Sequence, residues 1–169
     1  MASELQVDAI KHSGGTSALT IDSSGNVHKA GMILQTVIGT TSTKVTFTSS
    51  SYVDTNITAT ITPKFNTSKI LILSSMAFDT QSNGNIFAKL IRGSTDIKEE
   101  QFFGYFSADT AEYKVTRESH SFLDSPATTS STTYKWQVKV FSGGGTHYMQ
   151  WDDNNGHTES NIILQEIAQ

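Results

Sequence analysis

The residues of this sequence that could bind a ligand gather near its C-terminus, where two aromatic side chains border a polar turn. An aromatic ring beside acidic and amide side chains is a common way to hold a sugar, because the ring stacks on one face of the sugar and the polar groups bond its hydroxyls. Burial of Trp151 in a hydrophobic core is the alternative interpretation. The candidates for contact with a ligand or receptor are Tyr148, Trp151, Asp152, Asp153, Asn154 and His157.

The same segment is where a metal ion would be sought. His147 and His157 flank one loop, and residues 152–156 read Asp-Asp-Asn-Asn-Gly, which offers the oxygen ligands that calcium prefers. This run departs from the EF-hand pattern, because its glycine comes too early and no glutamate follows at the twelfth position. Asn-Asn-Gly is also typical of a tight turn. The sequence therefore predicts no metal and no other cofactor, and leaves a cation near 147–157 as the open alternative.

Signatures of catalysis are missing from the sequence. It has no cysteine, no Gly-x-Ser-x-Gly nucleophile elbow and no phosphate-binding loop, since the glycine run at 142–146 lacks a lysine. The carboxylate pairs at 99–100 and 152–153 fall where solvated turns are expected. We therefore expect a protein that is not an enzyme.

Charge and hydropathy limit the partners. Twelve Lys and Arg against 16 Asp and Glu give a net charge of −4, which offers no electrostatic attraction to nucleic acid. The longest apolar runs are about four residues, far below the roughly 20 that span a bilayer. We expect neither nucleic-acid binding nor membrane insertion.

The elements that must position the candidate residues are strands. Thr and Ser occupy 23 and 22 of the 169 positions, and threonine favours the pleated surface of a sheet. Apolar and polar residues alternate in segments such as 57–61 and 134–140, which predicts about ten short antiparallel strands. We predict an all-β protein in which residues 31–169 form an antiparallel jelly-roll β-sandwich. An immunoglobulin-type sandwich is disfavoured, because its cysteine pair and tyrosine corner are absent.

Residues 1–30 form a separate N-terminal segment with two short β pieces between glycine-rich turns. Such a unit is marginally stable by itself, because it offers few apolar side chains to bury. We therefore predict a short β-hairpin arm for attachment or oligomerisation. The residues expected to dock this arm onto a partner are Leu5, Val7, Ile10, Leu19, Ile21 and Val27.

Two further apolar groups exceed what one face of a strand can bury. Four aromatic residues fall within five positions, and the final strand at 161–167 is apolar on both faces. A central strand or contact with symmetry mates explains the second group, whereas core filling, subunit contact or a ligand platform explains the first. The candidates for a subunit interface are Phe102, Phe103, Tyr105, Phe106, Ile162, Ile163, Leu164 and Ile167.

Both ends of the sequence carry a resemblance to a known class of proteins. Residues 7–15 read Val-Asp-Ala-Ile-Lys-His-Ser-Gly-Gly, residues 18–27 read Ala-Leu-Thr-Ile-Asp-Ser-Ser-Gly-Asn-Val, and the chain closes with Asn-Ile-Ile-Leu-Gln-Glu-Ile-Ala-Gln at 161–169. These segments resemble small virion proteins of marine and cyanobacterial tailed phages. Such fibre-like proteins have heads similar to the trimeric jelly rolls of the tumour-necrosis-factor and complement-head type.

This resemblance implies a partner set and a location. It implies a homotrimer in the virion, assembled in the bacterial cytoplasm, whose arm binds other virion proteins. It implies a short tail or capsid fibre or spike whose head attaches to a host cell-surface glycan or protein. A capsid decoration or cement protein that stabilises the shell is the first alternative, and a carbohydrate-binding module is the second.

Overall fold

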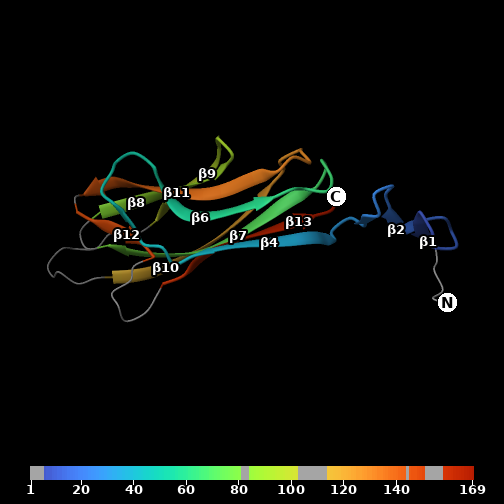
Figure 1. Ribbon diagram of the computed structural model, residues 1–169, viewed down its shortest axis with the longest axis horizontal. Helices are drawn as coiled ribbons and strands as arrows, with labels where there is room; N and C mark the ends of the chain where they lie inside the picture. The colour runs from blue at the N-terminus through green and yellow to red at the C-terminus, as the bar shows by residue number, and fades with distance from the viewer. Residues whose placement is uncertain (1–5, 81–83, 103–113, 144, 151–157) are drawn as a thin grey trace.

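The computed structural model describes residues 6–80, 84–102, 114–143, 145–150 and 158–169. Within these ranges the chain forms thirteen β-strands and no helix (Figure 1). In chain order the strands are β1 (Ala9–Lys11), β2 (Ser17–Ile21), β3 (Val27–His28), β4 (Ile33–Thr41), β5 (Val45–Phe47), β6 (Val53–Ile61), β7 (Lys69–Thr80), β8 (Gly84–Arg92), β9 (Thr95–Phe102), β10 (Lys114–Asp124), β11 (Thr132–Gly143), β12 (His147–Met149) and β13 (Ser160–Ile167).

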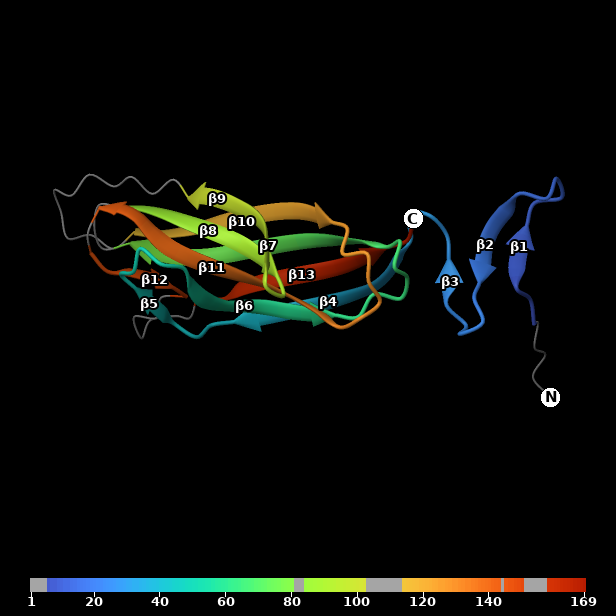
Figure 2. The same cartoon turned by 90° about the horizontal axis from the view of Figure 1, so that it is seen from above.

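Strands β4 to β13 build two antiparallel sheets that face each other (Figures 1 and 2). In the first sheet, β13 lies between β4 and β7, and β10 pairs with the other edge of β7. Strand β12 continues the line of β13 along β7 and pairs with β5, which continues the line of β4. The second sheet has the order β6-β11-β8-β9. We call them the β13 sheet and the β11 sheet.

The strand pairing defines the fold. We call the part of the chain built from β4 to β13 the head. When β4 with β5 and β12 with β13 are each counted as one interrupted strand, the head has eight strands. The first then pairs with the eighth, the second with the seventh, the third with the sixth and the fourth with the fifth. This pairing is that of a jelly roll, in which one long antiparallel ribbon is folded over into two sheets. The predicted all-β, antiparallel jelly-roll sandwich is confirmed.

The hydrophobic core fills the space between the sheets. Alternate residues of β11 point inward, as their period of two predicts, and Trp136 is almost completely buried. Its indole Nε1 donates to Ser74 Oγ at 2.9 Å. Tyr134 donates its hydroxyl to Asp124 at 2.7 Å, and Arg92 holds both oxygens of the same carboxylate at 2.7 and 2.8 Å. These bonds satisfy polar groups that would otherwise be costly to bury.

Two positions in the head are tightly constrained. At Gly39 of β4, a Cβ atom would lie 1.9 Å from the carbonyl oxygen of Thr58 in β6, so only glycine fits this crossing of the two sheets. Near the C-terminus, the buried carboxylate of Glu166 accepts hydrogen bonds from the backbone N–H groups of Lys64 and Phe65 and from Nε2 of Gln35. Glu166 therefore fixes the loop between β6 and β7 against β4 and β13.

The arm is a three-stranded antiparallel sheet, β1-β2-β3, so the structure adds a strand to the hairpin expected from the sequence. It extends beyond the end of the head at which the C-terminus lies (Figure 2). The ring of His28 contacts that of Phe65 with centroids 5.0 Å apart. The Gly31 N–H donates to the Ala168 carbonyl at 2.8 Å, and the Ala168 N–H donates to Met32 at 2.9 Å. These bonds anchor the base of the arm to the end of β13.

Candidate functional site

The ligand site predicted from the sequence falls largely outside the described residues. Trp151, Asp152, Asp153, Asn154 and His157 all lie there. Tyr148 is described: it is half-buried on β12, and the Lys44 ammonium lies 4.7 Å from its ring centroid.

Two described residues on either side of 151–157, Gln150 and Ser160, both bond to Ala77 of β7. The Gln150 N–H donates to the Ala77 carbonyl at 3.0 Å, and the Ala77 N–H donates to Ser160 Oγ at 2.9 Å. The end of β12 and the start of β13 are therefore tied to the same place on β7.

His147, the residue beside the predicted site, is completely buried. Its ring lies 5.6 Å from that of Phe47, and neither ring nitrogen has a hydrogen-bond partner. Burial lowers the pKa of His147, because the charged imidazolium loses its hydration. Among the described residues, no group of three or more His, Asp or Glu side chains is placed to hold a metal ion.

The predicted subunit-interface residues separate into three groups. Phe103, Tyr105 and Phe106 lie outside the described residues, and Phe102 ends β9 opposite Ile86. Ile162 and Leu164 are completely buried between the two sheets, so the prediction that they contact another subunit is wrong. Because side chains alternate along β13, Ile163 and Ile167 point to the opposite, outward face, where both are half-buried.

The outward face of the β13 sheet has an apolar centre. Ile38, Ile163 and Leu73 are direct neighbours across β4, β13 and β7, and Leu71 and Leu123 are paired on β7 and β10. Ile38 is 61% exposed in the single chain. Beside this row lies a groove of about 380 Å³, lined by Leu73, Ser74, Ser75, Ser119, His120, Ser121, Asn161 and Ile163. No described part of the chain covers this apolar face, which we call the β13 face.

The arm residues retain exposed apolar surface. Val7, Ile10 and Val27 are exposed, Leu19 and Ile21 are half-buried, and Leu5 lies outside the described residues. The arm therefore carries exposed apolar side chains that a partner could cover.

A second groove lies on the outward face of the other sheet. Its volume is about 470 Å³, and it is lined by Tyr52, Lys89, Asp96, Ile97, Lys98, Glu99 and Lys139. Tyr52 donates its hydroxyl to Glu99, which also accepts from Lys139 Nζ at 3.2 Å. These bonds lower the pKa of Glu99, whereas burial, followed by the bond to Glu99, raises the pKa of Tyr52.

Sequence reasoning missed this second groove. Its residues come from four separate segments, which meet because β6 and β8 both pair with β11 and β9 pairs with β8. The one signal available in the sequence was the polar alternate face of 135–139, which placed Lys139 on the outside of the sandwich.

Comparisons with known proteins give no family. No protein-family model matches the sequence, and no curated protein matches it. Among solved structures, the chain is similar to infectious bursal virus derived T=1 particles at 11% identity and a TM-score of 0.46, covering 94% of this chain and 36% of that one. It is similar to the VP2 subviral particle of infectious bursal disease virus at 12% identity and a TM-score of 0.40, covering 96% and 42%.

A third similar structure is dimeric latent PorU from Porphyromonas gingivalis, at 9% identity and a TM-score of 0.37, covering 92% of this chain and 15% of that one. The chain thus spans less than half the length of each of these proteins. The jelly-roll assignment rests on the strand pairing of the chain itself. In the described part of the chain, no helix is long and apolar enough to cross a membrane.

Proposed function

We propose that this chain is a non-enzymatic structural protein of a virion. In this proposal it is a short homotrimeric fibre or spike, whose arm binds other virion proteins and whose head attaches to the host surface. The resemblance of both sequence ends to small phage virion proteins supports the virion location. The observation that carries the trimer is the uncovered apolar β13 face.

The β13 face has the composition of a subunit interface. Its centre is formed by isoleucine and leucine side chains, whereas serine and asparagine line the adjoining groove. An apolar centre with a polar rim is the usual anatomy of a protein–protein contact. Exposed apolar patches of this kind on a soluble chain mark interaction sites. A second and a third copy of the same chain are the partners that a symmetric assembly would supply.

The placement of the arm supports attachment to the virion at one end of the head and contact with the host surface at the other end. β7 begins beside Ile167, at the arm end of the head, and twelve residues of strand carry it about 35–40 Å toward the opposite pole. Three copies related by an axis running along the heads would place three arms together at one end. The opposite pole of the head would then face away from the particle.

The central experiment measures the mass of the assembly in solution. Sedimentation equilibrium of the full chain at micromolar concentration is expected to give three times the chain mass of 18.4 kDa. A monomer at every concentration would refute the trimer. Purified trimer added to host cells is expected to block adsorption of the virion, since it would occupy the same receptors.

The exposed apolar residues of the arm also fit a cement protein that fastens neighbouring shell subunits. Copy number in the purified virion separates the two functions, because cement must approach the number of shell subunits whereas fibres occupy few positions. A high copy number, no block of adsorption and fragile particles in its absence would favour cement.

A further inference from the structure

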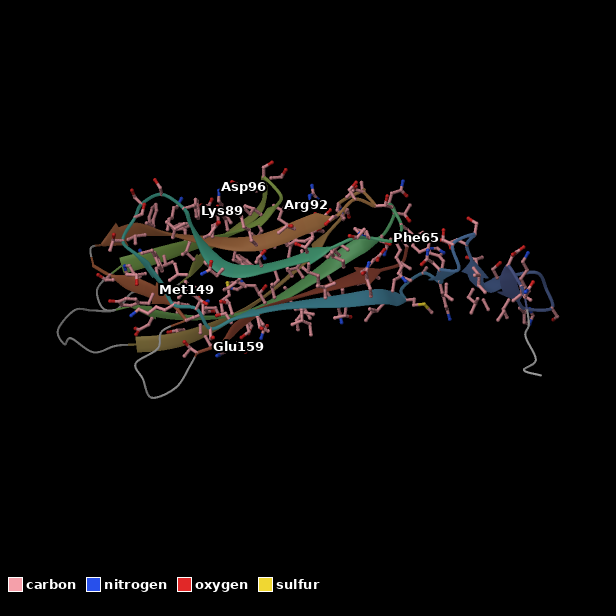
Figure 3. The ribbon with its side chains drawn as sticks, viewed as in Figure 1. Phe65, Lys89, Arg92, Asp96, Met149 and Glu159 are labelled. Carbon is pink, nitrogen blue, oxygen red and sulfur yellow. The ribbon has the colours of Figure 1, made fainter. Side chains whose placement is uncertain are left out.

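The groove on the outward face of the β11 sheet is a built polar site. Lys89 comes from β8, Asp96 and Glu99 from β9, Lys139 from β11, and Tyr52 from the residue before β6. Figure 3 shows Lys89 and Asp96 on the side of this sheet that faces away from the β13 sheet, whereas Met149 lies between the layers. The groove therefore stays open when the β13 face is covered.

Its side chains are held in place by one another. The ammonium groups of Lys89 and Lys139 each lie 4.4 Å from the centroid of the Tyr52 ring. Lys89 pairs with Asp96 at 3.0 Å, and Lys139 pairs with Glu99 at 3.2 Å. The two lysine side chains are only 17% and 23% exposed, although lysine is normally a mobile surface residue. Their donors are thus fixed before any ligand arrives.

An exposed aromatic ring stands beside this groove. Phe141 is 60% exposed on the same outward face of β11, and its ring packs against that of Phe87 with centroids 4.6 Å apart. The Lys139 ammonium lies 5.3 Å from the Phe87 ring, which links the aromatic pair to the groove. Phe141 is therefore a supported ring that remains largely exposed.

The charges indicate the kind of ligand. Lys89 and Lys139 are matched one to one by Asp96 and Glu99, so these pairs leave no excess charge to select an ion. The third lysine, Lys98, lies opposite the buried Leu90, and its ammonium is 5.7 Å from the Phe122 ring of β10. It therefore points away from Lys89 and Lys139. The paired groups still offer lysine donors and carboxylate acceptors together. A neutral ligand with many hydroxyls can use both, since each hydroxyl donates and accepts.

We propose that this groove and Phe141 together bind a neutral saccharide. One sugar ring stacks on Phe141, and the hydroxyls of that ring and its neighbour exchange hydrogen bonds with Lys139, Glu99 and Asp96. The volume of about 470 Å³ lies within the usual range for small-ligand sites. The inference rests on the proposed function, because it makes a neutral glycan the host-surface partner of the head.

Trimer formation would multiply the strength of such a site. Three copies joined through their β13 faces expose three grooves on their outward sheets. Weak individual sites linked in this way gain on the order of 10²–10⁴ in apparent affinity when the glycans are dense enough to be reached together.

The test uses the full chain and two sets of oligosaccharides. One set contains neutral hexose and N-acetylhexosamine oligomers, and the other contains uronate- and sulfate-bearing counterparts. Binding is measured by saturation-transfer NMR in solution and on a glycan array. Phe141→Ser removes the stacking ring, and Lys139→Ala removes a central donor of the groove. Lys135→Ala is the matched control, because Lys135 lies on the same face of β11 and is paired with Asp54 at 2.8 Å, outside the groove.

The wild-type chain is expected to bind at least one neutral saccharide with a dissociation constant of about 1 mM per site. Phe141→Ser and Lys139→Ala are each expected to weaken binding by about tenfold or more, and Lys135→Ala by less than about twofold. The inference is overturned if no neutral saccharide binds at about ten times that concentration. It is also overturned if only anionic saccharides bind, or if the control loses as much affinity as the other two variants.

Sedimentation of the same samples separates this inference from the proposed function. A trimer that blocks adsorption but binds no neutral saccharide would refute the saccharide site in the groove and leave the attachment function supported. A monomer that binds a neutral saccharide with the expected variant pattern would overturn the trimer and leave the groove standing.

Discussion

Replacing Ile38 by serine should dissociate the trimer without unfolding the chain. Ile38 lies on the edge strand β4 of the β13 face, next to Ile163, and is 61% exposed in the single chain, so the monomer buries less than half of it. Complete burial of an isoleucine side chain contributes about 1.5–3 kcal/mol. If trimer packing covers the exposed 61%, each copy gains roughly 0.9–1.8 kcal/mol and the trimer roughly 3–5 kcal/mol. At 1.4 kcal/mol per decade, Ile38→Ser raises the overall trimer dissociation constant about 10²–10⁴-fold.

Sedimentation equilibrium over a dilution series measures this change, and thermal unfolding of the dissociated variant checks that the fold persists. Phe141→Ser is the matched control, because Phe141 is 60% exposed but lies on the other sheet, so the trimer should be retained. The reasoning is refuted if Ile38→Ser leaves the trimer as stable as the wild type. It is equally refuted if both substitutions dissociate the assembly to the same extent.

Three further predictions concern the stability of the head. Gly39→Ala should lower the melting temperature through an overpacking cost of about 1–3 kcal/mol, because the new Cβ would lie 1.9 Å from the Thr58 carbonyl oxygen. Glu166→Gln should lower the free energy of unfolding, measured in urea, by about 1.5–3 kcal/mol, because an amide cannot accept all three hydrogen bonds of the carboxylate. Glu159→Gln, at an exposed glutamate, is the control and should change this free energy little. His147 has a lowered pKa when folded, so the unfolded chain binds its proton first and the free energy of unfolding should fall as the pH drops below about 6.5. His147→Phe should reduce that fall when urea midpoints at about pH 7.5 and 5.5 are compared; an equal fall in both proteins would contradict the assignment.

Much of the fold could be predicted from the alternation of apolar and polar residues, because in a strand with one buried face this alternation shows which side chains point inward. β11 is such a strand, and the inward position of Trp136 follows from it. β13 is not, because Ile162 and Ile163 are equally apolar and the pattern does not say which of them faces the core. Its inward residues pack in the core, whereas its outward apolar residues belong to the uncovered β13 face. The structure assigned Ile162 to the core and Ile163 to the outward face.

What the sequence determined by itself was local: strand-forming segments, glycine turns and the absence of thiol chemistry, all of which depend on residue type and short spacing. The tertiary structure decided everything that depends on neighbours far apart in the chain. The groove at Tyr52 requires residues 52, 89, 99 and 139 to meet. The apolar β13 face requires residues 38, 73 and 163 to align across three strands. Register between distant strands sets both, and it is fixed by the packing of the whole core, which no short stretch of sequence contains.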